Sequence, residues 1–177
     1  MRNRKESEKK IVYPARGAIG WRVLAFDPGF ERLGVAVVEK VSNRETLLFS
    51  ECIRTSATLS FDARLGELGT AVEQLIARWQ PDAVALEDIY FAKNAKTAMK
   101  VSEVRGMLSY LATSHTVPVF HYTPLQVKVA VTGYGQSDKK AVAMMVTKLV
   151  ALPVAKRLDD ELDAIAVGLT CLASVRH

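Results

Sequence analysis

Four carboxylates stand at the ends of apolar segments: Asp27, Glu87, Asp160 and Asp163. Asp27 closes the apolar segment 21–26, Glu87 closes 83–86, and the other two precede the apolar segment that starts at residue 164. Acidic side chains seldom end three separate core elements by accident. If these ends converge, they form an acidic pocket that needs divalent cations, and many nucleases cleave phosphodiester bonds with such a pocket.

Each acid also has a simpler interpretation. Asp160 and Asp163 are three residues apart on a predicted helix and share a face, so they could bind one ion or two neighbouring ions. The first of them, with its neighbours at 159 and 161, could instead cap the helix. Glu87 could leave its strand at the surface, and Asp27 before Pro-Gly could close an Asx turn. Taken singly, each acid fits a capping role.

The segment that begins at Asp27 has a further interpretation. Asp27-Pro28-Gly29 with Gly34 loosely matches the D-x-G-x-x-x-x-G hairpin that holds metal and phosphate in sugar-kinase-like ATPases. Such an ATPase has two domains and a second phosphate loop, so it needs about twice as many residues as the 177 present here. A small ATP-binding module is therefore the weakest alternative, and a thermal-shift experiment with ATP would exclude it.

The composition predicts one globular domain in a reducing, cytoplasmic setting. Apolar residues make up 49% of the 177 positions, enough for one sizeable core. Cys52 and Cys171 have no C-x-x-C spacing, which argues against a disulfide framework or a zinc site. The first ten residues lack an apolar signal segment, and no later run reaches the roughly 18 residues of a membrane span. We expect neither secretion nor membrane insertion.

Positive charge is concentrated in the middle of the chain. Residues 91–157 carry ten Lys/Arg against two Asp/Glu, whereas residues 23–90 carry six against eleven. A single surface lysine usually belongs to a solvated face, but this excess favours a polyanionic partner, since contacts to phosphates release counterions. Nucleic acid is the leading class of ligand.

Hydrophobic periodicity predicts an α/β domain. The expected strands cover residues 23–27, 33–39, 46–54, 83–87 and 117–122; the expected helices cover 65–79, 94–114, 124–131, 138–152 and 159–174. Thr123 before Pro124 is a helix N-cap, and Ser137 can cap the helix that follows. Consecutive strands followed by β-α-β units indicate a mixed sheet with an antiparallel edge and helices on its faces. Residues 1–20 form a basic N-terminal arm that we expect to be flexible.

Five motifs in order resemble the RuvC family of bacterial Holliday-junction resolvases. They are residues 26–29 with 33–38, residues 85–94, residues 101–106, residues 126–128 with 132, 133 and 139, and residue 160 with 163–166. The resemblance covers about residues 22–174 without large gaps. It implies an RNase H-like fold over residues 21–177, with a five-stranded mixed sheet and helices on both faces.

The resemblance also implies an activity. Members of the family are homodimers that bind a four-way DNA junction and nick two strands symmetrically, leaving 5′-phosphate and 3′-hydroxyl ends, in one pathway with RuvA and RuvB. The implied cofactors are two Mg²⁺ or Mn²⁺ ions per active site, with Asp27 bridging, Glu87 and Asp163 each holding one side, and Asp160 completing the set. Some members have His in place of Asp160.

The family's DNA contacts map onto basic and aromatic residues. These are Tyr90, which would stack on an unpaired base, the lysines Lys93 and Lys96 after it, and Lys128 and Lys139 near the scissile phosphate. The helix over 94–114 is the expected dimer interface. Two alternatives stay open: another RNase H-like nuclease acting on RNA or single-stranded ends, and a non-catalytic junction-binding protein.

Overall fold

The computed structural model describes residues 20–88, 95–150 and 158–175. Five strands form one sheet in the order β3-β2-β1-β4-β5. The β1–β2 and β2–β3 pairs are antiparallel, whereas β1–β4 and β4–β5 are parallel. The strands are β1 (Gly20–Asp27), β2 (Arg32–Val41), β3 (Arg44–Arg54), β4 (Ala83–Glu87) and β5 (Val119–Tyr122). The expected mixed sheet with an antiparallel edge is confirmed.

The first three strands extend beyond their apolar segments. Strand β1 begins at Gly20, which is paired with Val41, so the strand starts inside the range predicted for the N-terminal arm. Ser42 and Asn43 both have positive φ, 47° and 63°, the conformation of a two-residue hairpin loop with a type I′ turn. Because this tight turn keeps β2 and β3 in register up to its ends, polar residues are included in both strands.

The helices are α1 (Phe61–Trp79), α2 (Ala95–Ser114), α3 (Pro124–Thr132), α4 (Lys139–Leu149) and α5 (Asp159–Ser174). Helix α1 begins at Phe61 rather than at 65, because the Ser60 side chain accepts a hydrogen bond from the Ala63 amide. Thr123 caps α3 as predicted and forms a capping box with Gln126.

Helix α5 begins at Asp159 as predicted, but the caps of α4 and α5 differ from the predicted ones. Asp138, not Ser137, caps α4: its Oδ1 accepts a hydrogen bond of 2.7 Å from the Ala141 amide, and a carboxylate at this end also complements the helix dipole. Helix α4 ends at Leu149 instead of 152. The N-cap of α5 is Leu158, without a side-chain hydrogen bond, so the acids at 159–161 lie in the first turn and do not cap the helix.

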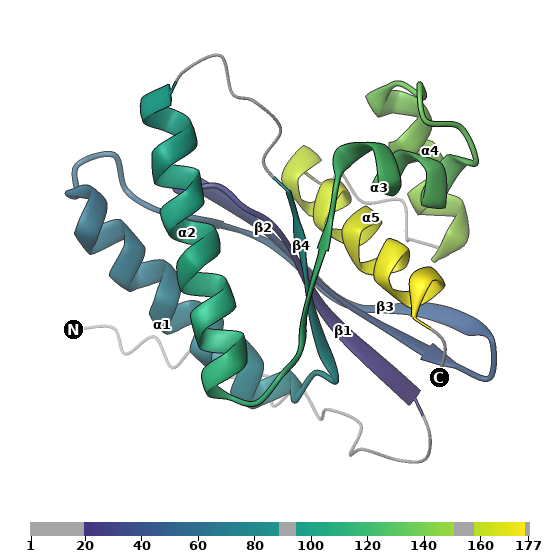
Figure 1. The fold of residues 1–177 in the computed structure, drawn as a ribbon, viewed down its shortest axis with the longest axis horizontal. Coiled ribbons are helices and arrows are strands. Elements are labelled where there is room, and N and C mark those ends of the chain that lie inside the picture. The colour runs from purple at the N-terminus through teal and green to yellow at the C-terminus, as the bar shows by residue number, and fades with distance from the viewer. Residues whose placement is uncertain (1–19, 89–94, 151–157, 176–177) are drawn as a thin grey trace, which may run out of the picture.

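Helices cover both faces of the sheet, as predicted. Figure 1 shows α1 and α2 on one face and α3, α4 and α5 on the other. One buried cluster fills the space between the sheet and α3–α5, and a second fills the space under α1 and α2. Helix α5 packs closely on β1 and β2, since a Cβ at Gly168 would lie 2.7 Å from Val38 Cγ2. Among the described residues, no helix has the length and apolar character needed to cross a membrane.

Candidate active site

Asp27 and Glu87 end adjacent parallel strands on the same face of the sheet. Phe26 is paired with Leu86 in the β1–β4 register, so the next residues along the two strands are Asp27 and Glu87. Side chains alternate along a strand. Ala25 and Ala85, two residues before these acids, belong to the core cluster under α5. Both carboxylates therefore point toward the α5 side at the carboxyl edge of the sheet.

Helix α5 brings its first turns to this edge. Its acids, Asp160 and Asp163, approach β1 and β2 closely because position 34 has no side chain. A Cβ at Gly34 would overlap the carbonyl oxygen of Asp160 and would lie 3.2 Å from Asp27 Cβ. Gly34 is the residue paired with Asp27 in the β1–β2 register. The structure thus brings all four sequence-predicted carboxylates to one end of the sheet.

The electrostatics show how strongly these acids interact. Burial raises the pKa of Asp27 from its ordinary value of 3.8 to about 7, and repulsion from Glu87, Asp163 and Asp160 adds to the effect. Burial, followed by Asp163, also raises the pKa of Glu87 to about 7. The pKa of Asp163 is raised by burial as well. A set of acids that destabilise one another's charged forms is typical of a site built for a cation.

Basic side chains pair with the two acids of α5. Lys139 Nζ, at the start of α4, lies 2.8 Å from Asp163 Oδ2, and Arg32 Nε, at the start of β2, lies 3.4 Å from Asp160 Oδ2. Cys52 of β3 also faces Asp160, with 3.8 Å between Sγ and Oδ2. Sequence reasoning placed Lys139 near the site but missed Arg32 and Cys52, because their contacts join positions more than 100 residues apart.

A pocket of about 250 Å³ opens beside the acids. Its polar lining consists of Glu87, Asp163, Lys128 and Lys139, and its apolar lining comes from α3, α4 and α5. Lys128 and Lys139 both lower the pKa of Glu87, in opposition to burial and the neighbouring acids. The pocket therefore has negative charge at the sheet and positive charge on α3 and α4, an arrangement suited to a phosphate held beside cations.

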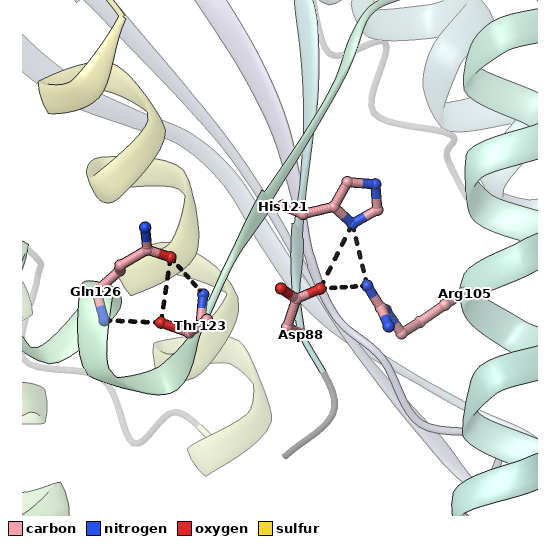
Figure 2. Close-up of polar contacts among 5 residues, drawn as sticks. All are labelled: Asp88, Arg105, His121, Thr123 and Gln126. Atoms are coloured by element: carbon pink, nitrogen blue, oxygen red, sulfur yellow. Dashed lines mark hydrogen bonds and ion pairs between the residues drawn. The ribbon is translucent and has the colours of Figure 1, made fainter.

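The capping box of α3 sets the position of Lys128. Thr123 follows the last residue of β5 directly, and its backbone N–H donates to Gln126 Oε1 at 2.8 Å. The Gln126 N–H in turn donates to Thr123 Oγ1 at 3.2 Å (Figure 2). These reciprocal bonds start the helix at the sheet edge, so Lys128 is presented about one turn later, beside the acids.

The four acids differ in grouping and in chemistry as potential ligands for divalent cations. Within residues 20–88, 95–150 and 158–175, no three His, Cys, Asp or Glu side chains are grouped closely enough to hold an ion. The four acids nevertheless supply only hard oxygen donors, and burial together with repulsion from neighbouring acids raises the pKa values of Asp27 and Glu87. Mg²⁺ and Mn²⁺ prefer such donors. The residues fit these ions, provided that Lys139 leaves Asp163.

The remaining predicted DNA contacts are Tyr90, Lys93 and Lys96. Tyr90 and Lys93 lie outside the described residues. Lys96 is exposed in the first turn of α2, on the opposite face of the sheet from α5. Of the five predicted DNA-binding residues, the structure brings Lys128 and Lys139 to the acids.

A polar cluster next to Glu87 was not predicted from the sequence. Asp88 accepts a hydrogen bond from Arg105 of α2, and His121 of β5 contacts both (Figure 2). The alternation of side chains along β4 could have indicated this cluster, because this alternation places Asp88 on the face opposite Glu87 and hence toward α2. His121 had no role assigned from the sequence.

Comparisons with known proteins give consistent results. A model of the family described as "Crossover junction endodeoxyribonuclease RuvC" matches residues 23–171. The chain is 41% identical over 147 residues to the protein of that name from Desulforamulus reducens, covering 83% of this chain and 90% of the relative. It is 43% identical over 148 residues to the one from Thermomicrobium roseum, covering 84% and 90%.

Solved structures agree with the sequence matches. The T. thermophilus RuvC in complex with a Holliday junction substrate superposes with a TM-score of 0.81 at 34% identity, over 86% of this chain and 93% of that chain. The yeast mitochondrial Holliday junction resolvase Ydc2 has a TM-score of 0.65 over 85% and 77% of the two chains. At 13% identity, this second likeness concerns the fold alone.

Proposed function

The chain belongs to the RuvC family of crossover junction endodeoxyribonucleases, and we propose that it resolves Holliday junctions by paired, symmetric nicks. Its five-stranded mixed sheet with helices on both faces is the RNase H-like fold expected from the sequence. The observation that carries the proposal is the convergence of Asp27, Glu87 and the two α5 acids at one sheet edge, beside Lys128 and Lys139.

The proposed cofactors are Mg²⁺ or Mn²⁺, two per active site. In this assignment Asp27 would be shared between the ions, Glu87 and Asp163 would each hold one, and Asp160 would complete the set. Two such ions supply the activation of a water and the stabilisation of charge on the attacking and leaving oxygens. Asp27 interacts electrostatically with all three other acids, which supports its central role.

The side chains of the protein contribute charge and position. Lys128 and Lys139 line the pocket and would neutralise the scissile phosphate there. Release of Lys139 from Asp163 would supply a carboxylate to the cation and an ammonium to the phosphate in the same step. The raised pKa values of Asp27 and Glu87 mean that protons must leave these acids before they bind metal.

The macromolecular partners follow from family membership. We propose a four-way DNA junction as substrate and a homodimer as the active unit, with α2 at the dimer interface. Met99 and Tyr110 of α2 are 65% and 70% exposed in the single chain, which supports an interface on this helix. Tyr90, Lys93 and Lys96 would contact the junction, and RuvA and RuvB would act in the same cytoplasmic pathway.

A substrate competition tests the proposal. A labelled four-way junction is incubated with the protein and Mg²⁺ or Mn²⁺, against an excess of unlabelled duplex of the same sequence at equal salt. Paired nicks in the junction, sealable by ligase without further processing, are expected to persist in the presence of duplex. Cleavage confined to RNA or single strands would favour another RNase H-like nuclease. Junction binding without cleavage would indicate a non-catalytic binding protein.

A further inference from the structure

Asp88 directly follows Glu87 but points to the opposite face of the sheet. There it meets helix α2, where Arg105 Nη2 donates a hydrogen bond of 2.5 Å to Asp88 Oδ1 (Figure 2). The Arg105 side chain is 22% exposed and the Asp88 side chain is 36% exposed, so this ion pair is partly shielded from solvent. Its helix is anchored in the core by Val104 and Leu108, which are 0% and 1% exposed.

His121 joins the pair from the neighbouring strand. Its Nδ1 lies 3.0 Å from Arg105 Nη2 and 3.7 Å from Asp88 Oδ1. A guanidinium can only donate hydrogen bonds, so in this contact Nδ1 is the acceptor. The Asp88 backbone N–H adds a bond of 2.8 Å to the Tyr122 carbonyl. Three elements, β4, β5 and α2, are thus tied together at the residue after Glu87.

We propose that Arg105, Asp88 and His121 position Glu87 for metal binding, by fixing the end of β4 against α2 and β5. The three form what we call the rear cluster. The rear cluster lies on the face of the sheet opposite Glu87, so we assign its members as positioning residues. The inference rests on the proposed function, in which Glu87 holds one side of the metal site.

Charge as well as geometry supports this role. Burial, Asp163 and then Asp88 raise the pKa of Glu87, so the Asp88 carboxylate adds to the repulsion at the strand end. Arg105 compensates that charge from behind. Groups that orient metal ligands in this way typically change metal affinity or activity by about 10- to 100-fold when removed. A purely structural pair would change the melting temperature without selectively weakening metal binding.

The test uses Asp88→Asn and Arg105→Lys in the full-length chain, with the double variant. Mn²⁺ affinity is measured by EPR without DNA, junction affinity in EDTA by anisotropy, and nicking under single-turnover conditions. Each single variant is expected to weaken Mn²⁺ binding by about 10- to 100-fold and to slow nicking at subsaturating Mn²⁺. The double variant should lose no more Mn²⁺ affinity than the more impaired of the two single variants, since the residues act together. Junction affinity should stay within threefold.

Glu73→Gln is the matched control. Glu73 Oε1 pairs with His115 Nε2 at 3.9 Å, an acid–histidine contact remote from the acids of the active site. This variant should retain wild-type Mn²⁺ affinity. The control separates loss of an ion pair in general from loss of the rear cluster.

Wild-type Mn²⁺ affinity in both single variants would overturn the proposal, as would a loss confined to junction affinity. If Arg105→Lys does not fold, Asp88→Asn alone decides the test. Asp88 is 36% exposed, and the side-chain amide introduced in Asp88→Asn retains a hydrogen-bond acceptor, so this variant is expected to fold. The Mn²⁺ titration is independent of cleavage. A wild-type chain that binds Mn²⁺ but nicks no junction would therefore contradict the proposed function, while the variants would still test the positioning role.

Discussion

Lys139 Nζ lies 2.8 Å from Asp163 Oδ2, which joins the first residue of α4 to the second turn of α5 across the acidic site. This hydrogen bond raises the pKa of the Lys139 ammonium. The ion pair places a positive charge where the proposed function places a divalent cation. Lys139 and a metal ion must therefore compete for the same carboxylate.

Replacing Lys139 should separate metal binding from catalysis. In Lys139→Met, Mn²⁺ at pH 8.5 is expected to bind roughly two- to fivefold more tightly, because a competing ion pair of this exposure is worth up to about 1 kcal/mol. Nicking should slow nevertheless, since the phosphate loses a positive partner. EPR titration and single-turnover cleavage provide the two measurements. Lys140→Met, at the adjacent exposed position, is the control, and unchanged Mn²⁺ affinity in Lys139→Met would contradict the competition.

Removing the charge of Asp27 should stabilise the metal-free protein at neutral and alkaline pH. Burial and the neighbouring acids raise the folded pKa of Asp27 from 3.8 to about 7. When the folded pKa exceeds the unfolded value, ionisation destabilises the fold: the cost is absent below about pH 4, grows as the pH rises and is complete above about pH 7. Asp27→Asn removes this cost, and the amide is nearly isosteric.

Melting curves in EDTA check this prediction. One pKa unit corresponds to about 1.4 kcal/mol, and 1 kcal/mol shifts the Tm of a domain of this size by roughly 2–4 °C. Asp27→Asn should therefore melt at least several degrees higher than wild type at pH 8, with little difference at pH 4. Glu67→Gln, at an exposed position of α1, should show no such dependence. A lower Tm for Asp27→Asn at pH 8 would argue against mutual repulsion.

The affinity for metal should rise with pH, whereas the stability of the metal-free protein should fall. Burial contributes most to raising the pKa values of Asp27 and Glu87 to about 7, and both acids must be ionised to bind a cation. We expect the Mn²⁺ association constant to rise up to about tenfold per pH unit for each proton displaced between pH 6 and 7, and to level off near pH 8. Isothermal titration at fixed ionic strength measures this curve. A flat profile would mean that neither acid binds the ion.

Stability and nicking should depend more on the absence of a side chain at position 34 than on the absence of one at position 66. In Gly34→Ala, the new Cβ would overlap the Asp160 carbonyl oxygen and push the start of α5 away from β2. We expect a loss of roughly 1–3 kcal/mol in the free energy of unfolding, as for other overpacked sites, and at least a tenfold slower nicking rate. Gly66→Ala, where no atom lies within 4 Å, is the control and should be neutral or stabilising. Equal effects of the two substitutions would contradict the close-approach explanation.

Local pattern predicted most of the fold. The apolar segments before Asp27 and Glu87 were sufficient to define two core strands, because strands buried on both faces have few polar positions. Thr123-Pro124 specified a helix start through its side chain and its fixed φ. The turn at Ser42 and Asn43 was not predicted, since neither residue is the glycine that usually marks such a turn.

Long-range polar contacts were beyond the reach of that pattern. The Arg32–Asp160 and Arg105–Asp88 pairs join residues from different elements, and their partners depend on how the helices pack on the sheet. The meeting of Asp27 and Glu87 could be predicted, because the carboxyl ends of adjacent parallel strands lie at the same edge of a sheet. The approach of the two α5 acids depends on how that helix packs. Which basic side chain pairs with which acid depends on the distance that each side chain can span.

We assign the cleavage to the carboxylates Asp27, Glu87, Asp160 and Asp163. The most direct test of this assignment is a comparison of wild type with Asp27→Asn and Glu87→Gln on a labelled four-way junction in Mg²⁺. Both variants should bind the junction as tightly as wild type and produce no detectable nicks, with Glu67→Gln retaining full activity. Nicking by Asp27→Asn or Glu87→Gln at the wild-type rate would contradict the assignment of the active site.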